Sequence, residues 1–145
     1  MALAQDTIDF IDAVVGGPAH LVGHSVGAGA VLHAALRDLV CRDQAIVVER
    51  PADEDQAADK VRGDLRGVGA LTLVMASDDD IITLEHTLAL YRVIKDSELA
   101  VVPGTSHFLT QEKPDLCNGT VVDFLASDPL ATVAPMRRVP SGSAA

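Results

Sequence analysis

The sequence is poor in aromatic residues, in basic residues and in cysteine. Each shortage argues against a particular kind of core, partner or metal site. It has no tryptophan, one tyrosine and three phenylalanines, so aliphatic side chains must fill its core. Its 11 Lys and Arg are outnumbered by 21 Asp and Glu. The resulting net charge of −10 argues against nucleic acid or an anionic membrane as a partner. The two cysteines, Cys41 and Cys117, lack metal-ligand spacing, and we expect no metal site and no cofactor.

Long apolar runs and a basic leader are also missing. No stretch approaches the 18 apolar residues that suggest a membrane span. The first turns carry Asp6, Asp9 and Asp12, where a signal peptide would be basic. Together with two thiols that read as unpaired, these features predict a cytoplasmic protein. At 145 residues and 48% hydrophobic, the chain is long enough for one domain with a core of its own.

Apolar periodicity predicts helices that alternate with strands. Helices are expected at 2–15 and 26–39, over a stripe of Leu84, Leu88, Tyr91 and Ile94, and from Lys113-Pro114 onward. Strands are expected at 19–23, 45–48, 71–76 and 98–102, and the polar stretch 49–69 suggests a short surface helix. This order is typical of an α/β fold with a mainly parallel sheet of about four strands and flanking helices. We expect the domain to span 1–126 and to be followed by a flexible tail, 127–145.

The most informative stretch is Gly23-His24-Ser25-Val26-Gly27, which lies between a predicted strand and a predicted helix. A G-x-S-x-G sequence in that context indicates a sharp turn that presents a nucleophilic serine. We expect a Cβ at Gly23 or Gly27 to clash where strand and helix converge. The turn points the Oγ of Ser25 out above the sheet and places the N–H of Val26 beside it.

Two further strand ends carry side chains that could act with this serine. Asp78-Asp79-Asp80 follows the strand 71–76, and Pro103-Gly104-Thr105-Ser106 leads into His107 after the strand 98–102. Active groups collect at the carboxyl ends of parallel strands. A serine needs an imidazole within hydrogen-bond reach as its base, and the imidazole needs a carboxylate to orient it. Taken singly, the Asp triplet also reads as a turn or helix cap, and the histidine as a structural residue.

In these motifs the chain resembles the carboxyl-terminal half of an α/β-hydrolase-fold protein of the bacterial esterase-like type, over about residues 1–126. The resemblance implies a serine esterase with a Ser-Asp-His triad on a nucleophile elbow, acting on carboxylic esters or related acyl substrates. By motif, Ser25 matches the nucleophile, His107 the base and Asp79 the acid, since Ala76 takes the glycine position of the G-x-x-D pattern. A one-residue slip leaves Asp78 and Asp80 as alternatives. Val26 matches the oxyanion-hole donor, and His24 is expected to line the pocket.

The chain also departs from that family. Four strands that precede the elbow in the family, one of whose loops donates a second oxyanion N–H, have no counterpart before residue 19, and the lid is reduced to 49–69. The alternative function is therefore a catalytically weak or inactive α/β-hydrolase remnant that acts as a non-catalytic interaction module. Without those strands, the strand 19–23 becomes a sheet edge, and we expect a homo-oligomer joined there.

Overall fold

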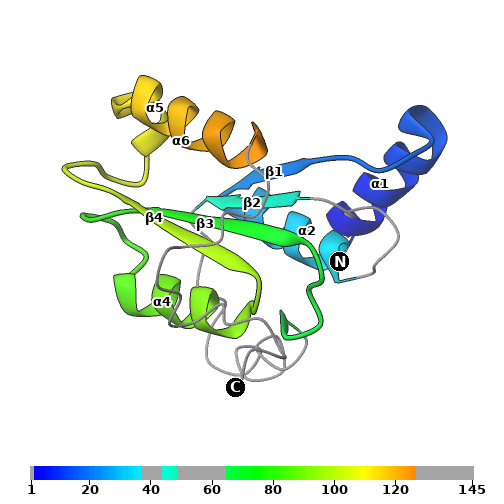
Figure 1. Cartoon of the computed structure of the whole chain (residues 1–145), viewed down its shortest axis with the longest axis horizontal. Helices are drawn as coiled ribbons and strands as arrows, with labels where there is room; N and C mark the ends of the chain where they lie inside the picture. Colours follow the sequence, from blue (N-terminus) through cyan, green and yellow to red (C-terminus); the bar gives the residue numbers. More distant parts are fainter. Residues whose placement is uncertain (1, 37–43, 49–64, 127–145) are drawn as a thin grey trace, which may run out of the picture.

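The computed structural model describes residues 2–36, 44–48 and 65–126, and these form a parallel sheet with helices on both faces (Figure 1). The strands are β1 (Leu21–His24), β2 (Gln44–Val48), β3 (Leu71–Ser77) and β4 (Ser97–Val102). They lie side by side in chain order, and every pairing is parallel. The predicted α/β class and four-stranded parallel sheet are confirmed. The predicted tail at 127–145 and most of the predicted surface helix in 49–69 lie outside the described residues.

Alternation of side chains along β3 divides the core into two layers. Val74 faces a cluster formed with α2 (Val26–Ala35) and α4 (Leu84–Val93), whereas Leu73 and Met75 face a cluster formed with α5 (Leu109–Glu112) and α6 (Pro114–Ala126). Figure 1 shows α5 and α6 on one face of the sheet and α4 on the other. Because β3 is covered on both faces, its carboxyl end is a rigid support for the residues that follow it.

In the first helix, the buried residues follow the predicted apolar stripe only in part, because the helix geometry changes along its length. Its expected apolar face is buried in α1 (Ala2–Phe10) at Ala4 and Ile8, and in η1 (Ile11–Val15) at Ile11. Val15, the last member of that expected stripe, is 52% exposed. The segment η1 is a π-helix, whose wider turn rotates later residues away from the face set by α1. As expected, the helix ends at Gly16, which has the left-handed φ of 67°.

The last two predicted helices form with small differences. In α6 the expected stripe holds, with Cys117 and Phe124 buried and Val121 and Leu125 half-buried. In α4 the buried positions are Thr87 and Leu90, and the expected Leu84, Leu88 and Tyr91 are only half-buried. The short helix α5 was not predicted, and it begins directly after His107 and Phe108. Among the described residues, no helix is long and apolar enough to cross a membrane.

Candidate active site

Ser25 occupies the strained turn that the motif predicts. It joins β1 to α2 with φ 54° and ψ −119°, and it is the only non-glycine residue with positive φ in the described part of the chain. Such a conformation is unfavourable for a residue with a side chain, so the surrounding structure must impose it. The N–H of Ala28 donates to the Ser25 carbonyl at 3.0 Å, which ties the turn to the first turn of α2.

Close approach of strand and helix explains one of the two motif glycines. A Cβ on Gly23 would lie 2.4 Å from the Gly27 carbonyl oxygen and 2.7 Å from a methyl carbon of Val31. Gly23 is therefore required, as predicted. The same prediction for Gly27 is wrong, because a Cβ built there meets no atom within 4 Å. The carbonyl group of Gly27 faces the strand, whereas a side chain at Gly27 would point into open space.

His107 lies beside the serine, as the order of strand ends predicts. It belongs to the loop 103–108 that follows β4, and its Nε2 is 3.2 Å from Ser25 Oγ. Its side chain is 19% exposed, so the ring is largely shielded yet reachable from solvent. Three segments far apart in the sequence thus meet at the carboxyl edge of the sheet: the ends of β1, β3 and β4.

The carboxylate that meets His107 is Asp80. Its Oδ1 lies 3.2 Å and its Oδ2 3.3 Å from His107 Nδ1, and its side chain is only 2% exposed. Two further bonds fix this carboxylate, since the Ile82 N–H donates to Oδ1 at 3.1 Å and the Ser77 hydroxyl to Oδ2 at 3.3 Å. A buried carboxylate needs such partners in order to remain ionised.

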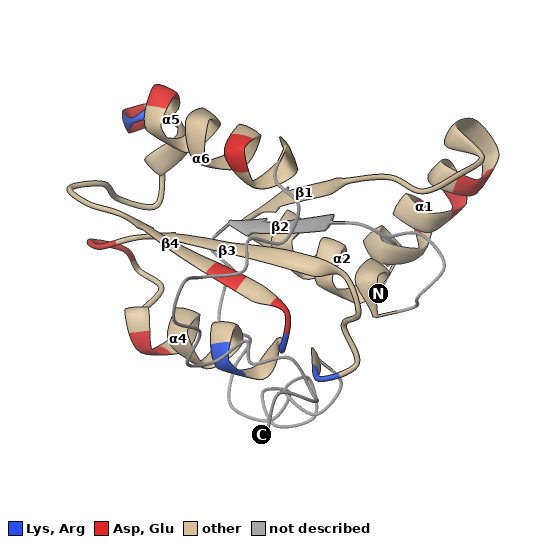
Figure 2. Ribbon diagram, viewed as in Figure 1, with Lys and Arg blue, Asp and Glu red and all other residues tan. Residues whose placement is uncertain are grey.

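The prediction that Asp79 pairs with His107 is wrong. The strand β3 continues to Ser77, one residue further than expected, and this shifts the turn by one position. The backbone N–H of Asp79 donates to the Thr105 carbonyl at 3.2 Å, and its side chain is exposed. The alternative left open by the motif, Asp80, is the residue whose side chain returns toward the imidazole. Figure 2 shows this acidic turn as the red stretch that leaves β3.

Asp78 has a different environment from both neighbours. Its Oδ1 accepts the Thr105 N–H at 3.1 Å, across to the loop that carries His107. The backbone N–H groups of Gly104 and Thr105 hold the pKa of this carboxyl below its ordinary 3.8. Sequence reasoning missed this contact, since nothing local distinguishes three consecutive aspartates. It also missed Ser77, although a polar residue at the end of an apolar strand was a usable signal.

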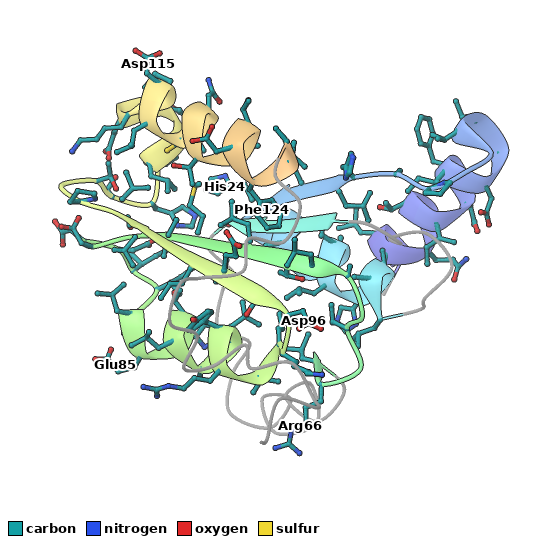
Figure 3. The ribbon with its side chains drawn as sticks, viewed as in Figure 1. His24, Arg66, Glu85, Asp96, Asp115 and Phe124 are labelled. Carbon is teal, nitrogen blue, oxygen red and sulfur yellow. The ribbon has the colours of Figure 1, made fainter. Side chains whose placement is uncertain are left out.

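His24 and Val26 flank the serine. The Nε2 of His24 is 3.1 Å from the His107 carbonyl oxygen, and the two rings lie 5.1 Å apart at 34°. Figure 3 shows His24 on the face of the sheet that carries α6. That it lines a substrate pocket stays a prediction. Val26 is the first residue of α2, so its N–H has no acceptor within the helix and lies at the positive end of the helix dipole.

Neither cysteine has a described link to this site. Cys117 is buried in α6 with its thiol 3.4 Å from the Leu109 carbonyl, and Cys41 lies outside the described residues. No group of three or more His, Cys, Asp or Glu within the described ranges could hold a metal ion.

Comparison with solved structures identifies the fold. A predicted CIB-like hydrolase from Thermoplasma acidophilum is 26% identical, with a TM-score of 0.75 over 85% of this chain. An alpha/beta hydrolase enzyme from a sediment metagenome of the Mar Chica lagoon is 15% identical, with a TM-score of 0.74 over 85% of this chain and 68% of its own. The enol-lactonase from Burkholderia xenovorans LB400 is 15% identical, with a TM-score of 0.73 over 86% of this chain and 72% of its own.

The chain spans 57% of the length of the Thermoplasma protein. No family model matches the sequence, and no curated protein is similar to it. The strand order, the helices on both faces and the three structural likenesses agree with one another. The described part of the chain therefore has the α/β-hydrolase fold.

Proposed function

We propose that the protein is a serine hydrolase that acts on carboxylic esters or related acyl compounds. The observation that carries this proposal is the unbroken line of side-chain contacts from Ser25 Oγ through His107 to Asp80. Each group lies at the carboxyl end of a different parallel strand, where α/β proteins place their reactive groups. The strained backbone of Ser25 supports the same proposal, because strain at one polar residue is typical of functional sites.

In the proposed reaction His107 is the base and then the acid. Its Nε2 takes the hydroxyl proton as Ser25 Oγ attacks the carbonyl carbon, and Nδ1–H remains bonded to Asp80. The imidazolium then gives the proton to the leaving alkoxide, which departs as an alcohol and leaves an acyl-serine. A water molecule repeats the sequence, with His107 again taking and returning one proton, and releases the carboxylic acid. Asp80 orients the imidazole throughout, and its carboxylate is itself held by bonds from Ser77 and Ile82.

Charge that develops on the carbonyl oxygen needs a donor close to Ser25. We assign this role to the N–H of Val26, because Val26 follows the nucleophile directly and is the first residue of α2. One missing oxyanion donor costs about 10²–10³ in rate, so a site with this donor alone would be a slow catalyst. Modest turnover with clear dependence on Ser25 is therefore the expected behaviour.

A second candidate function is a non-catalytic interaction module. It is favoured by three exposed apolar side chains, each directly after a residue of the proposed triad: Val26, Ile81 and Phe108 are 66%, 86% and 54% exposed. Exposed apolar side chains near one another are typical of surfaces that bind another molecule. The same side chains would equally suit the apolar part of an ester, so the experiment must decide.

Hydrolysis of p-nitrophenyl acetate separates these candidates. We expect wild-type protein to release p-nitrophenol above background, with an initial burst as Ser25 is acylated, and Ser25→Ala to lose both. Thr120→Ala, which removes a hydroxyl from α6, is the matched control and should retain them. Folded wild-type protein with no turnover would favour the interaction module, and equal turnover by Ser25→Ala would contradict the proposed nucleophile.

A further inference from the structure

The loop that carries His107 is held by two carboxylates that take no part in the proposed proton transfer. Thr105 and Ser106, the two residues before His107, each donate a backbone N–H to a side chain of another element. Asp78, at the end of β3, accepts from Thr105 at 3.1 Å, and Glu112, in α5, accepts from Ser106 at 2.7 Å. Two successive backbone N–H groups are thus bonded to carboxylates, one from a residue that precedes the loop in the sequence and one from a residue that follows it.

The contact with Asp78 is part of a two-way bridge between the acidic turn and the histidine loop. Thr105 donates its N–H to the Asp78 side chain and accepts the Asp79 N–H at its carbonyl. The hydroxyl of Thr105, which is buried, also donates to the Val102 carbonyl at 2.7 Å. Because Asp80 and His107 lie one and two residues beyond these bonds, the bridge sets the separation between carboxylate and imidazole.

The contact with Glu112 fixes the other side of the loop. Its second oxygen, Oε1, accepts the Ser106 hydroxyl at 2.6 Å, so both oxygens bind the same residue. The hydroxyl and the N–H of Ser106 lower the pKa of Glu112 from its ordinary 4.5. The amine of Lys113 bonds to the Pro103 carbonyl and adds positive charge near both carboxylates. The loop is therefore tied to Glu112 of α5 and to Lys113 by two residues that precede His107, Pro103 and Ser106.

We infer that Asp78 and Glu112 are positioning residues: they hold the backbone at Thr105 and Ser106 so that the His107 ring reaches Asp80 and Ser25 together. The inference rests on the proposed function for its catalytic consequence, but the geometry it describes is independent of turnover. Both carboxylates are exposed, so their bonds are surface contacts next to the site and not core supports. Misplacing a catalytic group by about 1 Å can cost on the order of 10²-fold in rate.

The test compares Asp78→Ala with Asp78→Asn and with Asp79→Ala. Asparagine keeps an oxygen that can accept the Thr105 N–H, whereas alanine removes it. Asp79 has an exposed side chain one residue away, so its variant controls for loss of an acidic residue in this turn. Glu112→Ala and Glu112→Gln form the second pair, since glutamine can still bind the Ser106 hydroxyl.

Two readouts keep the inference separate from the proposed function. The first is the proton resonance of the His107 Nδ1–H, observed by NMR, which reports the bond to Asp80 whether or not the protein turns over. We expect Asp78→Ala and Glu112→Ala to lose this resonance to solvent exchange, and Asp79→Ala to keep it. The second is kcat for p-nitrophenyl acetate, which should fall by about 10- to 100-fold in the two alanine variants, with KM little changed and kcat largely restored in Asp78→Asn.

Loss of the resonance in a protein without turnover would support positioning and reject the proposed function. An Asp78→Ala protein that is folded and matches Asp79→Ala in both readouts would overturn the role of Asp78, and the same result for Glu112→Ala would overturn the role of Glu112. Circular dichroism establishes folding first. If Asp78→Ala does not fold, Asp78→Asn is the test, because it keeps an acceptor for the Thr105 N–H and should keep the resonance. Loss of the resonance in a folded Asp78→Asn protein would then overturn the role given to that hydrogen bond.

Discussion

After β3 and β4, Asp80 and His107 are held by hydrogen bonds, whereas between β1 and α2 Ser25 is held by steric contact. On the first side the chain uses the buried carboxylate of Asp80, with bonds from Ser77 and Ile82. On the second it uses the absence of a side chain at Gly23 and a strained φ at Ser25. The position of Asp80 therefore depends on specific hydrogen-bonding groups, whereas the position of Ser25 depends on how closely the backbones of β1 and α2 can approach.

The strands that precede these three residues also differ in their place in the sheet. The strand β3 is paired on both edges and covered on both faces. Among the described strands β1 pairs with β2 alone, and Val22 on it is 58% exposed. The acid thus follows an interior strand, whereas the nucleophile and the base follow the two edge strands of the described sheet, β1 and β4. Changes that act on one side only can show whether this contrast is real.

The largest expected effect lies on the hydrogen-bonded side. Asp80→Asn should keep the shape of the turn but favour the wrong imidazole tautomer, and comparable changes elsewhere lower kcat by about 10⁴. Asp79→Asn is the matched control, because its side chain is exposed, and it should retain wild-type activity. Ester hydrolysis measures both. A larger loss in Asp79→Asn than in Asp80→Asn would restore the assignment made from the motif.

The next effect lies on the steric side. Gly23→Ala places a Cβ 2.4 Å from the Gly27 carbonyl oxygen, which is backbone, so strand and helix must separate. Overpacking of this kind costs about 1–3 kcal/mol in the free energy of unfolding. Gly27→Ala meets no atom within 4 Å and lies within α2, where alanine is favoured over glycine by roughly 0.5–1 kcal/mol. Urea denaturation should show opposite signs for the two variants.

A third effect concerns the edge itself. We propose that two copies of the chain associate through β1, because its outer N–H and C=O groups have no partner strand among the described residues and Val22 is exposed. Burying apolar surface contributes about 25 cal/mol per Å², while repulsion between exposed charges is screened beyond about 8 Å at physiological salt.

Size-exclusion chromatography with light scattering measures this association at micromolar concentration. The wild type should elute as a dimer or larger species, and Val22→Lys, which adds a charge to the edge, should be a monomer. A wild-type monomer that unfolds cooperatively would mean that the edge of β1 is closed in another way.

The smallest effect concerns pH. Asp78 and Glu112 have pKa values below their ordinary 3.8 and 4.5, so they stabilise the folded state above those values. That stabilisation is lost as pH falls through the lower pKa values of the folded protein, and it is small because both groups are exposed. The urea midpoint should therefore fall less between about pH 7 and about pH 3 in an Asp78→Asn, Glu112→Gln protein than in the wild type. Equal falls in the urea midpoint would argue against a stabilising role for the ionised carboxylates of Asp78 and Glu112.

The features that could be predicted from the sequence are those that local patterns determine. The strands, the turn at Ser25 and the position of His107 follow from apolar runs and from residues that must be small or must end a strand. The choice among three aspartates could not be predicted, because it depends on one extra residue in β3 and on hydrogen bonds with Thr105, which is 26 or 27 residues away in the chain. The π-helical turn at 11–15, which exposes Val15, likewise has no local signal.

Reaction with a fluorophosphonate, followed by mass mapping of the labelled residue, tests the central claim most directly. If the line from Asp80 through His107 activates Ser25, the wild type should take up one phosphonyl group, on Ser25, and Ser25→Ala should take up none. Thr120→Ala should react as fast as the wild type. Absence of label on folded wild-type protein, label on another residue, or equal labelling of Ser25→Ala would contradict the account.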